Sequence, residues 1–460
     1  MMLLSVAFAL AAPVLASDEV TSLPGWKGAL PSKQYSGYLD LPGGKHHHYW
    51  HVQSEGSPSS DPLVFWFNGG PGCSSMGGFF TEQGPFTVNQ DLTLATNPGR
   101  WNTFANTVFT ESPAGAGYSY ADSQAGYNHN DTSVAIDNYN AIQQFLVKFP
   151  EFNGRDIYLA GESYAGIYVP TLAQQILRGN NSNINLKGIM VGNGCIGSEV
   201  GACSAKEGGQ IDIDFMYDRA IISPKAYQAV NAACQSDWGS DACQAAINTA
   251  TGETGPIDVY NIYYPCASNE LNSSHVLRDP KHPNYPWFAP PSAVDMAVAL
   301  KQGPQACFVD NDPVTRYLNK PLVKVAIHIA AAAKGEWRVC GPRVGGGYQF
   351  NYDSTEKDET KDVYPELVKS SMRVLIFNGD VDLCVPYNGN QHWTSQFGEV
   401  LGVKEEWRPW LVDKQVAGYV TSYNSDFTFA TVKGAGHMVP EFQPAAGKAL
   451  AQRFIAGQPL

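Results

Sequence analysis

The sequence predicts an α/β fold in which helices cover both faces of a mostly parallel sheet. Two observations indicate this fold: short apolar runs that end in glycine-containing turns, and helical patterns that lie between these runs. Strands that are apolar along their whole length are typical of parallel sheets buried on both faces. Alternating strands and helices build such sheets. A third observation, a serine placed between a strand and a helix, indicates where the chemistry lies.

The expected core strands are rich in β-branched and aromatic residues. In chain order they are Leu63–Phe67, Thr107–Thr110, Ile157–Ala160, Gly188–Val191, Arg373–Phe377 and Phe427–Val432. A first helix should begin at Asp131 and Thr132, which can cap its amino end. Its expected inward positions follow the three-to-four spacing of a helix: Ile136, Tyr139, Ile142, Phe145, Leu146 and Phe149. A second helix should run from Tyr164 to Leu177, with Val169, Leu172 and Ile176 inward.

The chain of 460 residues is expected to divide into four parts. Residues 1–16 form a signal peptide, residues 17–194 and 313–460 form the two parts of the α/β core, and residues 195–312 form an inserted cap. The insertion breaks the strand–helix rhythm and holds six of the nine cysteines, so disulfides should staple it. The stretch Gly341–Lys361 is glycine-rich and then charged, which predicts an exposed loop.

Several features indicate export from the cell. The first residues form a short apolar stretch with Val14 and Ala16 before a cleavage position at Ser17, whereas a membrane span needs about 20 apolar residues. Sequons for N-glycosylation occur at Asn130, Asn180 and Asn272. Nine cysteines in an oxidising compartment predict four disulfides and one remaining thiol. We expect a secreted protein that is not bound to a membrane, with a vacuolar or lysosomal lumen as second choice.

Composition argues against two classes of protein. With 43% hydrophobic and 16% charged residues, the chain can bury a large core, unlike a disordered tail. The net charge is −13 and no long Lys/Arg run is present, so the sequence lacks the electrostatic footprint of a nucleic-acid-binding protein.

The segment Gly161–Gly166 indicates the chemistry, because it lies between an expected strand and an expected helix. This is the context of a nucleophile elbow, a sharp turn that projects a serine hydroxyl above the sheet. The acid and the histidine should follow later in the chain, on loops after strands. Asp382 and His437 each follow one of the expected strands, so Ser163, Asp382 and His437 are the predicted catalytic triad. Asp380 is the alternative acid.

An oxyanion hole needs two backbone N–H groups that point at the developing charge. One is expected from Tyr164, directly after the nucleophile. The other is expected from Gly70 in the glycine turn Asn68–Gly72, where missing side chains let the backbone approach the substrate.

At four places the sequence resembles the serine carboxypeptidase family. The matching segments are Trp66–Ser75, Glu111–Tyr120, Gly161–Gly166 and Gly436–Pro440, and the resemblance extends from Ser36 to the C-terminus. It implies the α/β-hydrolase fold and an acid exopeptidase whose substrates are peptides with a free C-terminal carboxylate. It also implies a secreted member of fungal type.

The resemblance further implies roles for single residues. The substrate carboxylate would be bound by Asn68, Gly69, Glu82 and Glu162. Two carboxyl groups that face a third cannot all be ionised, so at least one keeps its proton and binding weakens as the pair ionises. Trp66 would support this network, and the substrate pockets would involve Trp66, Tyr164, Cys384 and Met438. Cys73 should pair with Cys340, and Cys384 is the expected remaining thiol, with a buried inert cysteine as the alternative.

Three functions stay open at this stage. They are an acid exopeptidase, an esterase, acyltransferase or hydroxynitrile lyase on the same fold, and a non-catalytic protective homologue. Asn68, Glu82 and Glu162 favour the exopeptidase, because an ester has no carboxylate for them to bind. The run Lys45–His48 invites a metal site, but no carboxylate lies nearby in sequence, and alternate strand residues face opposite sides. We therefore expect no metal and no cofactor.

Overall fold

The structure of the protein is a computed structural model that describes residues 18–264 except 236 and 256, residues 313–340 and residues 348–460. The predicted signal peptide, the sequon at Asn272 and two of the cysteines, Cys266 and Cys307, lie outside the described residues. Within the described part of the chain, no helix combines the length and the apolar character that crossing a membrane requires.

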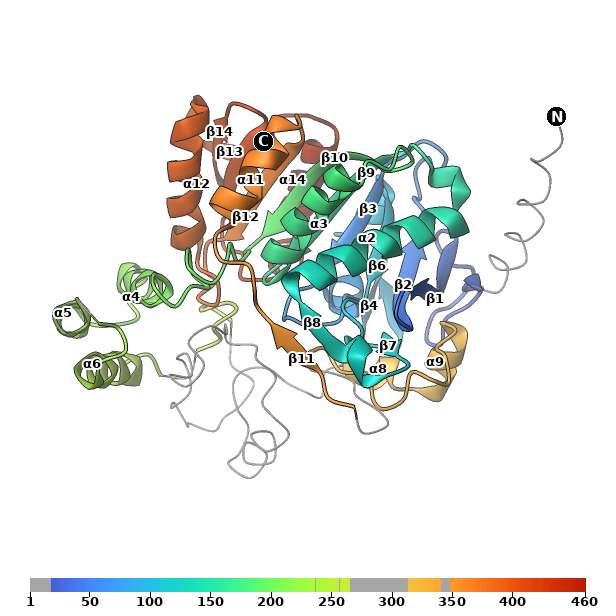
Figure 1. The fold of residues 1–460 in the computed structure, drawn as a ribbon, viewed down its shortest axis with the longest axis horizontal. Helices are drawn as coiled ribbons and strands as arrows, with labels where there is room; N and C mark the ends of the chain where they lie inside the picture. The colour runs from blue at the N-terminus through green and yellow to red at the C-terminus, as the bar shows by residue number, and fades with distance from the viewer. Residues whose placement is uncertain (1–17, 236, 256, 265–312, 341–347) are drawn as a thin grey trace.

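A large mixed sheet lies at the centre of the molecule (Figure 1). Its strands follow the order β1 (Gln34–Leu41), β2 (Lys45–Val52), β6 (Asn106–Thr110), β3 (Leu63–Phe67), β9 (Asp156–Glu162), β10 (Asn185–Gly192), β12 (Arg373–Gly379), β15 (Phe427–Val432), β14 (Gln415–Tyr423) and β13 (Val403–Val412). Short β7 (Tyr120–Ala121) pairs with β2. Neighbouring strands from β6 to β15 are parallel, and the strands at either end are antiparallel. The predicted strands and the mostly parallel sheet are confirmed.

Helices cover both faces of this sheet, as predicted. One face packs against α2 (Asp131–Lys148), α3 (Ala165–Gly179), α11 (Tyr364–Lys369) and α12 (Tyr387–Leu401). The other face packs against the π-helix Gly78–Glu82, α8 (Pro313–Leu318), α9 (Pro321–Ala326), α13 (Val439–Phe442) and α14 (Pro444–Ile455). Successive residues of a strand point to opposite faces, so Phe65 and Phe67 of β3 join the first cluster while Val64 and Trp66 join the second. This explains why β3 is apolar along its whole length.

The first predicted helix, α2, differs from its prediction in two details. Asn130 rather than Asp131 caps it, because the Asn130 side chain accepts the N–H of Ser133 at 2.8 Å. Asp131 points into the protein instead and is 2% exposed. Ile136 is 41% exposed rather than inward, because the inner face of the helix contains Val134, Ala141, Ile142, Phe145 and Leu146. The second predicted helix, α3, has Val169, Leu172 and Ile176 buried as expected.

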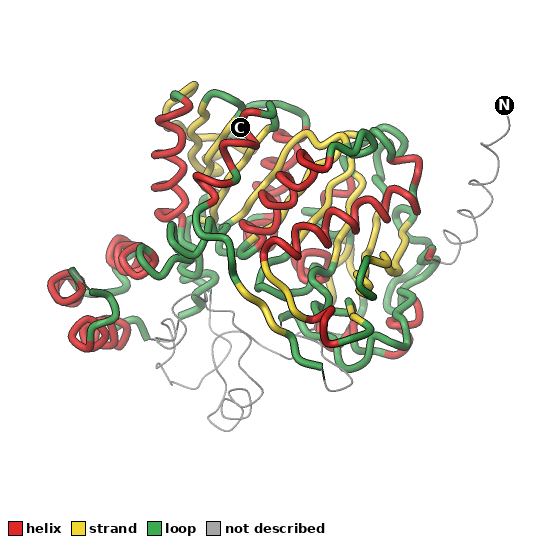
Figure 2. Tube along the Cα trace, in the orientation of Figure 1, coloured by secondary structure: helices red, strands yellow, loops and turns green. Residues whose placement is uncertain are grey.

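In residues 195–264 the alternation of strands and helices stops. These residues contain α4 (Gly208–Asp218), α5 (Pro224–Cys234) and α6 (Asp241–Gly252), which share a buried cluster of their own. Figures 1 and 2 show these helices projecting beside the body of the sheet. Two disulfides, Cys195–Cys203 and Cys234–Cys243, lie in this part of the chain.

The prediction of an exposed loop at Gly341–Lys361 is only partly right in the described residues 348–361, where Gln349, Lys357 and Lys361 are exposed but other residues are buried. Asn351–Asp353 forms β11, which pairs with β8 (Asn128–Asn130), and Glu359 is fully buried. The charged sequence misleads because Asp131 accepts the N–H groups of Thr355 and Glu356, each at 2.6 Å. Short elements complete the fold: β4 (Phe86–Val88), β5 (Leu94–Thr96), α10 (Glu359–Asp362) and 3₁₀ turns at Trp101–Thr103, Gln124–Tyr127 and Pro150–Phe152.

Candidate active site

The predicted triad residues follow three strands of the sheet. Ser163 follows β9, Asp382 lies on the loop after β12, and His437 lies on the loop after β15. These strands are parallel and near neighbours, in the order β9, β10, β12, β15. The carboxyl ends of parallel strands share one edge of the sheet, so all three loops converge there.

Ser163 occupies the sharp turn between β9 and α3. Its φ of +63° is a left-handed conformation that a serine adopts only where its surroundings hold it. The Ser163 N–H donates to the carbonyl of Gly192 at 3.0 Å, and its own carbonyl accepts the N–H groups of Gly166 and Cys195. A Cβ on Gly161 would lie 2.5 Å from the carbonyl oxygen of Phe67, so only glycine fits there. This arrangement is a nucleophile elbow.

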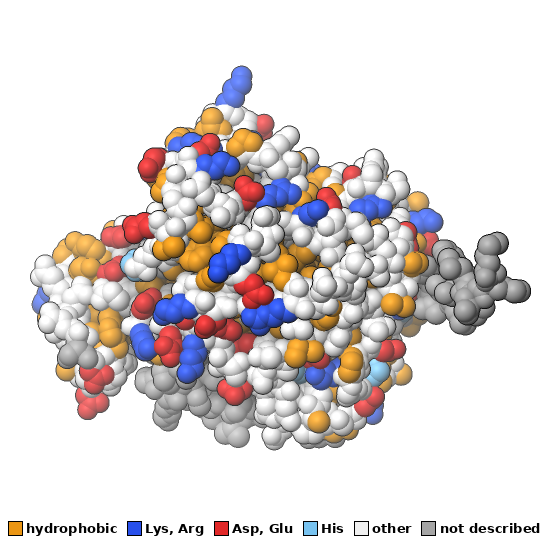
Figure 3. Space-filling model, turned by 45° about the horizontal axis from the view of Figure 1, so that its top comes forward, with side chains coloured by type: hydrophobic (Ala, Val, Ile, Leu, Met, Phe, Trp, Pro, Cys, Tyr) orange, Lys and Arg blue, Asp and Glu red, His pale blue; other side chains and the backbone are white. Residues whose placement is uncertain are grey.

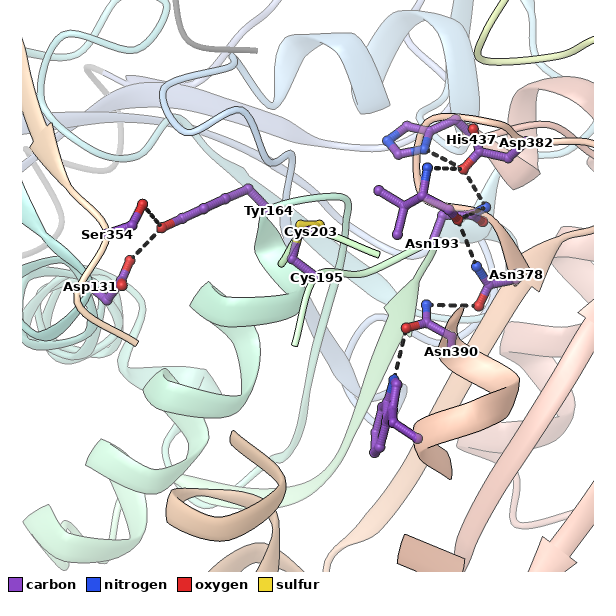
Figure 4. Close-up of a disulfide and its surroundings, with 12 residues drawn as sticks. Asp131, Tyr164, Asn193, Cys195, Cys203, Ser354, Asn378, Asp382, Asn390 and His437 are labelled. Atoms are coloured by element: carbon purple, nitrogen blue, oxygen red, sulfur yellow. Dashed lines mark hydrogen bonds and ion pairs between the residues drawn. A yellow bond between two sulfur atoms is a disulfide. The ribbon is translucent and has the colours of Figure 1, made fainter. Parts of the chain in front are cut away.

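Asp382 and His437 contact each other directly. His437 Nδ1 lies 2.8 Å from Asp382 Oδ2, and both side chains are buried (Figure 4). Asp382 also accepts the backbone N–H groups of Cys384 at 2.8 Å and Val385 at 3.0 Å, which fix the carboxylate. A carboxylate facing Nδ1 keeps the proton on that nitrogen, which leaves Nε2 to act as a base.

The alternative acid, Asp380, has a different place. Its Oδ1 accepts the N–H of Gly434 at 2.6 Å, so it orders the turn before His437. The structure therefore places Asp382, and not Asp380, against the histidine.

Two residues beside this pair were missed in the sequence. Asn193 Nδ2 donates to Asp382 Oδ2 at 2.8 Å, and Asn193 Oδ1 accepts the N–H of Gly379 at 2.9 Å (Figure 4). Tyr260 comes from the insertion, and its carbonyl accepts the N–H of His437 at 2.7 Å. Asn193 could have been found, because it follows an apolar strand, as the acid does, and lies between two glycines. Tyr260 has no such signal.

Replacing Asn193 by alanine should lower kcat by about tenfold, because a hydrogen bond to a charged group contributes roughly 1.5–3 kcal/mol. The lost donor would let the Asp382 carboxylate turn away from His437. Steady-state kinetics on a blocked dipeptide checks this. Asn378→Ala is the matched control, since Asn378 is equally buried but bonds Val385 and Asn390 rather than Asp382. A control that loses as much kcat as Asn193→Ala would contradict the prediction.

The glycine turn after β3 lies against the nucleophile. A Cβ on Gly69 would be 2.4 Å from the Tyr164 nitrogen and 2.8 Å from the Ser163 Cβ. The next residue, Gly70, has a φ of +114°, which favours glycine. The backbone of this turn and the N–H of Tyr164 thus lie side by side, where two oxyanion-hole donors would be needed.

Asn68 joins the two glutamates that the resemblance indicated. Its Nδ2 donates to Glu162 Oε1 at 2.8 Å and to Glu82 Oε1 at 3.2 Å. Its Oδ1 accepts the indole N–H of Trp66 at 2.8 Å, which fixes the amide orientation. The other oxygen of each glutamate, Oε2, has no hydrogen-bond partner among the described residues. Each carboxyl group can therefore form a further hydrogen bond to a substrate.

Burial sets the protonation of this cluster. Glu82 and Glu162 are 2% and 5% exposed. Desolvation by burial raises the pKa of Glu82 to about 7, against the lowering effect of the neighbouring Glu162 carboxyl group and of the hydrogen bond from Asn68. Desolvation, followed by the charge of Glu82, raises the pKa of Glu162 well above its usual range. The pair therefore holds at least one proton throughout the acid range.

The remaining predicted residues are placed as follows. Trp66 is 2% exposed and supports Asn68, so the structure does not put it on an open pocket surface. The Tyr164 hydroxyl is engaged, since it donates to Asp131 at 2.9 Å and lies 2.6 Å from Ser354 (Figure 4). Cys384 is a buried thiol next to Asp382, and Met438 is partly buried beside His437. A disulfide joins Cys73 to Cys340, the pair that the resemblance implies.

The histidine run of β2 does not gather into one site. His46 lies 2.6 Å from Asp40 and 3.3 Å from Asp122, carboxylates that the hairpin and a later loop bring to it. His47 is buried, and His48 contacts Glu111. In the described part of the chain, only Asp382, Cys384 and His437 are spaced as metal ligands would be, and these are residues of the site above. On the face in Figure 3, acidic and basic side chains are interspersed.

The fold and the elbow with its Asp–His pair define the class: this is an α/β-hydrolase fold. The chain belongs to the serine carboxypeptidase family, whose sequence model matches residues 24–457. Its fold is similar to the crystal structure of Kex1(Δ)p, a prohormone-processing carboxypeptidase from Saccharomyces cerevisiae. That comparison has a TM-score of 0.71 at 22% identity and covers 96% of both chains.

Relatives from plants and an animal match over most of their length. The chain is 34% identical to serine carboxypeptidase-like 20 of Arabidopsis thaliana, covering 99% of this chain and 96% of the relative. It is 33% identical to serine carboxypeptidase 1 of Hordeum vulgare, covering 96% and 93%. It is 35% identical to the lysosomal protective protein of Mus musculus, covering 96% and 94%. The expected fungal source stays a prediction, while the family and the disulfides indicate the secretory pathway.

Proposed function

We propose that this protein is a carboxypeptidase that releases C-terminal amino acids from peptides at acid pH through an acyl-enzyme. The observation that carries this proposal is the buried cluster of Asn68, Glu82 and Glu162 directly beside the elbow. Glu162 immediately precedes Ser163, so a carboxylate bound by the cluster would lie one residue's length from the nucleophile. A site that must bind the terminal carboxylate acts only at chain ends.

The proposed chemistry uses the three residues of the triad in turn. Ser163 attacks the last peptide carbonyl while His437 Nε2 takes its proton and then gives it to the departing amine. Asp382 stabilises the imidazolium, and the N–H groups of Gly70 and Tyr164 bind the oxyanion. Water, activated by the same histidine, then releases the acyl group from Ser163.

The other functions fit the site less well. An esterase, acyltransferase or hydroxynitrile lyase would have no use for two protonated carboxyl groups beside the elbow, because its substrate carries no carboxylate. A non-catalytic protective homologue would have no need for the contact between Asp382 and His437. Both alternatives remain outcomes of the experiments below.

The decisive experiment compares a blocked dipeptide with its C-terminal amide at acid pH. We expect kcat/KM for the free acid to exceed that for the amide by about a hundredfold or more. The reason is that the amide lacks the charged carboxylate that the site would bind by hydrogen bonds. Asn68→Ala should reduce this preference at least tenfold, because it removes the donor shared by the two carboxyl groups. Equal turnover of acid and amide by the native enzyme would contradict the proposal.

We also propose that residues 195–312 cap the site, and that Tyr164, Cys384 and Met438 line the substrate pockets. The contact between Tyr260 and His437 supports a cap, since it places part of the insertion on a catalytic loop. An extracellular location, with the vacuolar or lysosomal lumen as second choice, fits the three disulfides among the described residues. Asn180 is exposed at the end of α3 and is open to a glycan, while Asn130 also serves as a helix cap.

A further inference from the structure

The segment Glu111–Tyr120 resembles the family but has no role in the site described so far. It follows β6, and its first residue, Glu111, is 0% exposed. A carboxylate at such depth is tolerated only where donors or a cation surround it. The contacts of Glu111 therefore indicate what the segment does.

Glu111 collects donors from four parts of the chain. Its Oε2 accepts the backbone N–H of Tyr118 at 2.8 Å and lies 2.9 Å from His48 Nδ1. Its Oε1 accepts the hydroxyl of Ser74 and, at 3.1 Å, the indole N–H of Trp337. The segment curls around its own first residue to make these contacts.

Gly117 and Ser119 allow the segment to fold back on Glu111. A Cβ on Gly117, whose φ is +50°, would overlap the Glu111 carboxyl group. Ser119 Oγ donates to the carbonyl of Glu111 at 2.6 Å and accepts the N–H of His48 at 2.8 Å. The pattern of the segment is thus explained by one buried carboxylate.

His48 is held by a hydrogen bond on each side of its ring. Ser36 Oγ donates to the carbonyl of Ile327 at 2.7 Å, which uses its single proton. His48 Nε2, 2.9 Å from Ser36 Oγ, must therefore be the donor between them. On the other side His48 Nδ1 lies 2.9 Å from Glu111 Oε2, and one proton lies between this nitrogen and the carboxyl group. The imidazole and the carboxyl group thus form a hydrogen-bonded pair in which both side chains are 0% exposed.

Ser74 connects this hydrogen-bonded pair to the glycine turn of the site. Its hydroxyl bonds Glu111, and its N–H donates to the carbonyl of Val339 at 2.7 Å. The next residue, Ser75, accepts the N–H of Asn68 at 3.2 Å and donates to the carbonyl of Thr110 at 2.7 Å. The turn that carries Asn68, Gly69 and Gly70 is thus held to the end of β6 through two adjacent serines.

We propose that Glu111 and His48 are positioning residues that hold the turn Asn68–Ser75 in register with Ser163, and so control selection of a free C-terminal carboxylate. The inference rests on the proposed carboxypeptidase function. Ser163 lies in the turn after a different strand, β9, and Asp382 and His437 lie on loops that this pair does not contact in the described structure. A displaced turn would therefore weaken carboxylate binding more than it weakens the triad.

The variant Glu111→Gln tests this, because neither orientation of its amide fits. The NH₂ group must face either the N–H of Tyr118 or the indole N–H of Trp337. The measurement is the ratio of kcat/KM for a blocked dipeptide to that for its C-terminal amide, in which the fraction of active enzyme cancels. We expect the ratio to fall at least tenfold, since small misplacements of a binding group cost about a hundredfold.

A control and a second variant keep the test decisive. Tyr118→Phe removes only a hydroxyl that bonds the carbonyl of Leu318 at 2.6 Å, so it should lower thermal stability and leave the ratio unchanged. Ser74→Ala cuts the link itself, and its effect should not add to that of Glu111→Gln. An unchanged ratio in folded Glu111→Gln would overturn the inference.

Two further outcomes are informative. If Glu111→Gln does not fold, the ratio in Ser74→Ala decides, and a native ratio there overturns the inference. Equal turnover of acid and amide by the unaltered enzyme overturns the proposed function and this inference with it. A preserved preference in the unaltered enzyme separates failure of the inference from failure of the function.

Discussion

Replacing Ser163 by alanine is expected to lower kcat by roughly a millionfold, because residues of such a triad act as one unit. The variant should fold normally, since alanine is smaller than serine and the turn is held by the backbone bonds of Ser163. Binding of a blocked dipeptide should persist, because Asn68, Glu82 and Glu162 are untouched. Steady-state kinetics and equilibrium dialysis of the peptide check the two halves of this result.

Two measurements make the result specific. A fluorophosphonate should label the unaltered enzyme at Ser163, as mass spectrometry of the peptides would show, and should not label Ser163→Ala. Ser198→Ala, a change on a nearby loop, is the control and should retain full activity. Equal residual activity in Ser163→Ala and the unaltered enzyme would contradict the assigned nucleophile. An unaltered enzyme that neither turns over peptides nor reacts with the probe would favour the non-catalytic homologue.

The second large effect is a rise of KM with pH. Below the raised pKa of Glu82, about 7, the pair with Glu162 holds protons and can donate to the substrate carboxylate. Above it, the pair loses a donor and gains a negative charge that repels the substrate. KM for a blocked dipeptide should therefore rise about tenfold per pH unit beyond this point, as expected for loss of one proton.

Variants separate this effect from other titrations. Glu82→Gln keeps a permanent N–H donor and carries no charge, so its KM should lose the rise near neutral pH. Glu441→Gln is the matched control, because the charge of Glu441 also acts on Glu162 but its side chain lies on the surface. It should keep the rise. A Glu82→Gln enzyme with the native pH dependence of KM would contradict the role of the pair.

Local patterns in the sequence predicted a large part of this protein. The six strands are apolar because both faces of the sheet are covered, and the triad residues follow strands because parallel strands end at one edge. Five consecutive positions, 161–165, specify the elbow, because the small residues Gly161 and Ala165 leave room for a strained serine. These features depend on neighbours in the chain, so a single sequence shows them.

Other features depend on contacts between distant residues. Asn193 and Asp382 are 189 residues apart, Tyr352 and Asp131 are 221 apart, and Glu111 and His48 are 63 apart. Each contact buries a polar or charged group whose partner no local pattern names. For this reason the charged segment 348–361 gave no sign of its buried residues, and Asp122, 76 residues from His46, could not be found as its partner. Asp40 is only six residues from His46, so the expectation that no carboxylate lies nearby in sequence was wrong.

The sequence by itself determined the α/β class, and it indicated the candidate nucleophile and the loops that carry the candidate acid and histidine. Only the tertiary structure decided that Asp382 rather than Asp380 faces His437, that Asn193 orients this acid, and that His48 lies against Glu111. The physical reason is that hydrophobic periodicity is a property of one segment. The charge and orientation of a buried polar group are set instead by the donors and acceptors that folding brings to it.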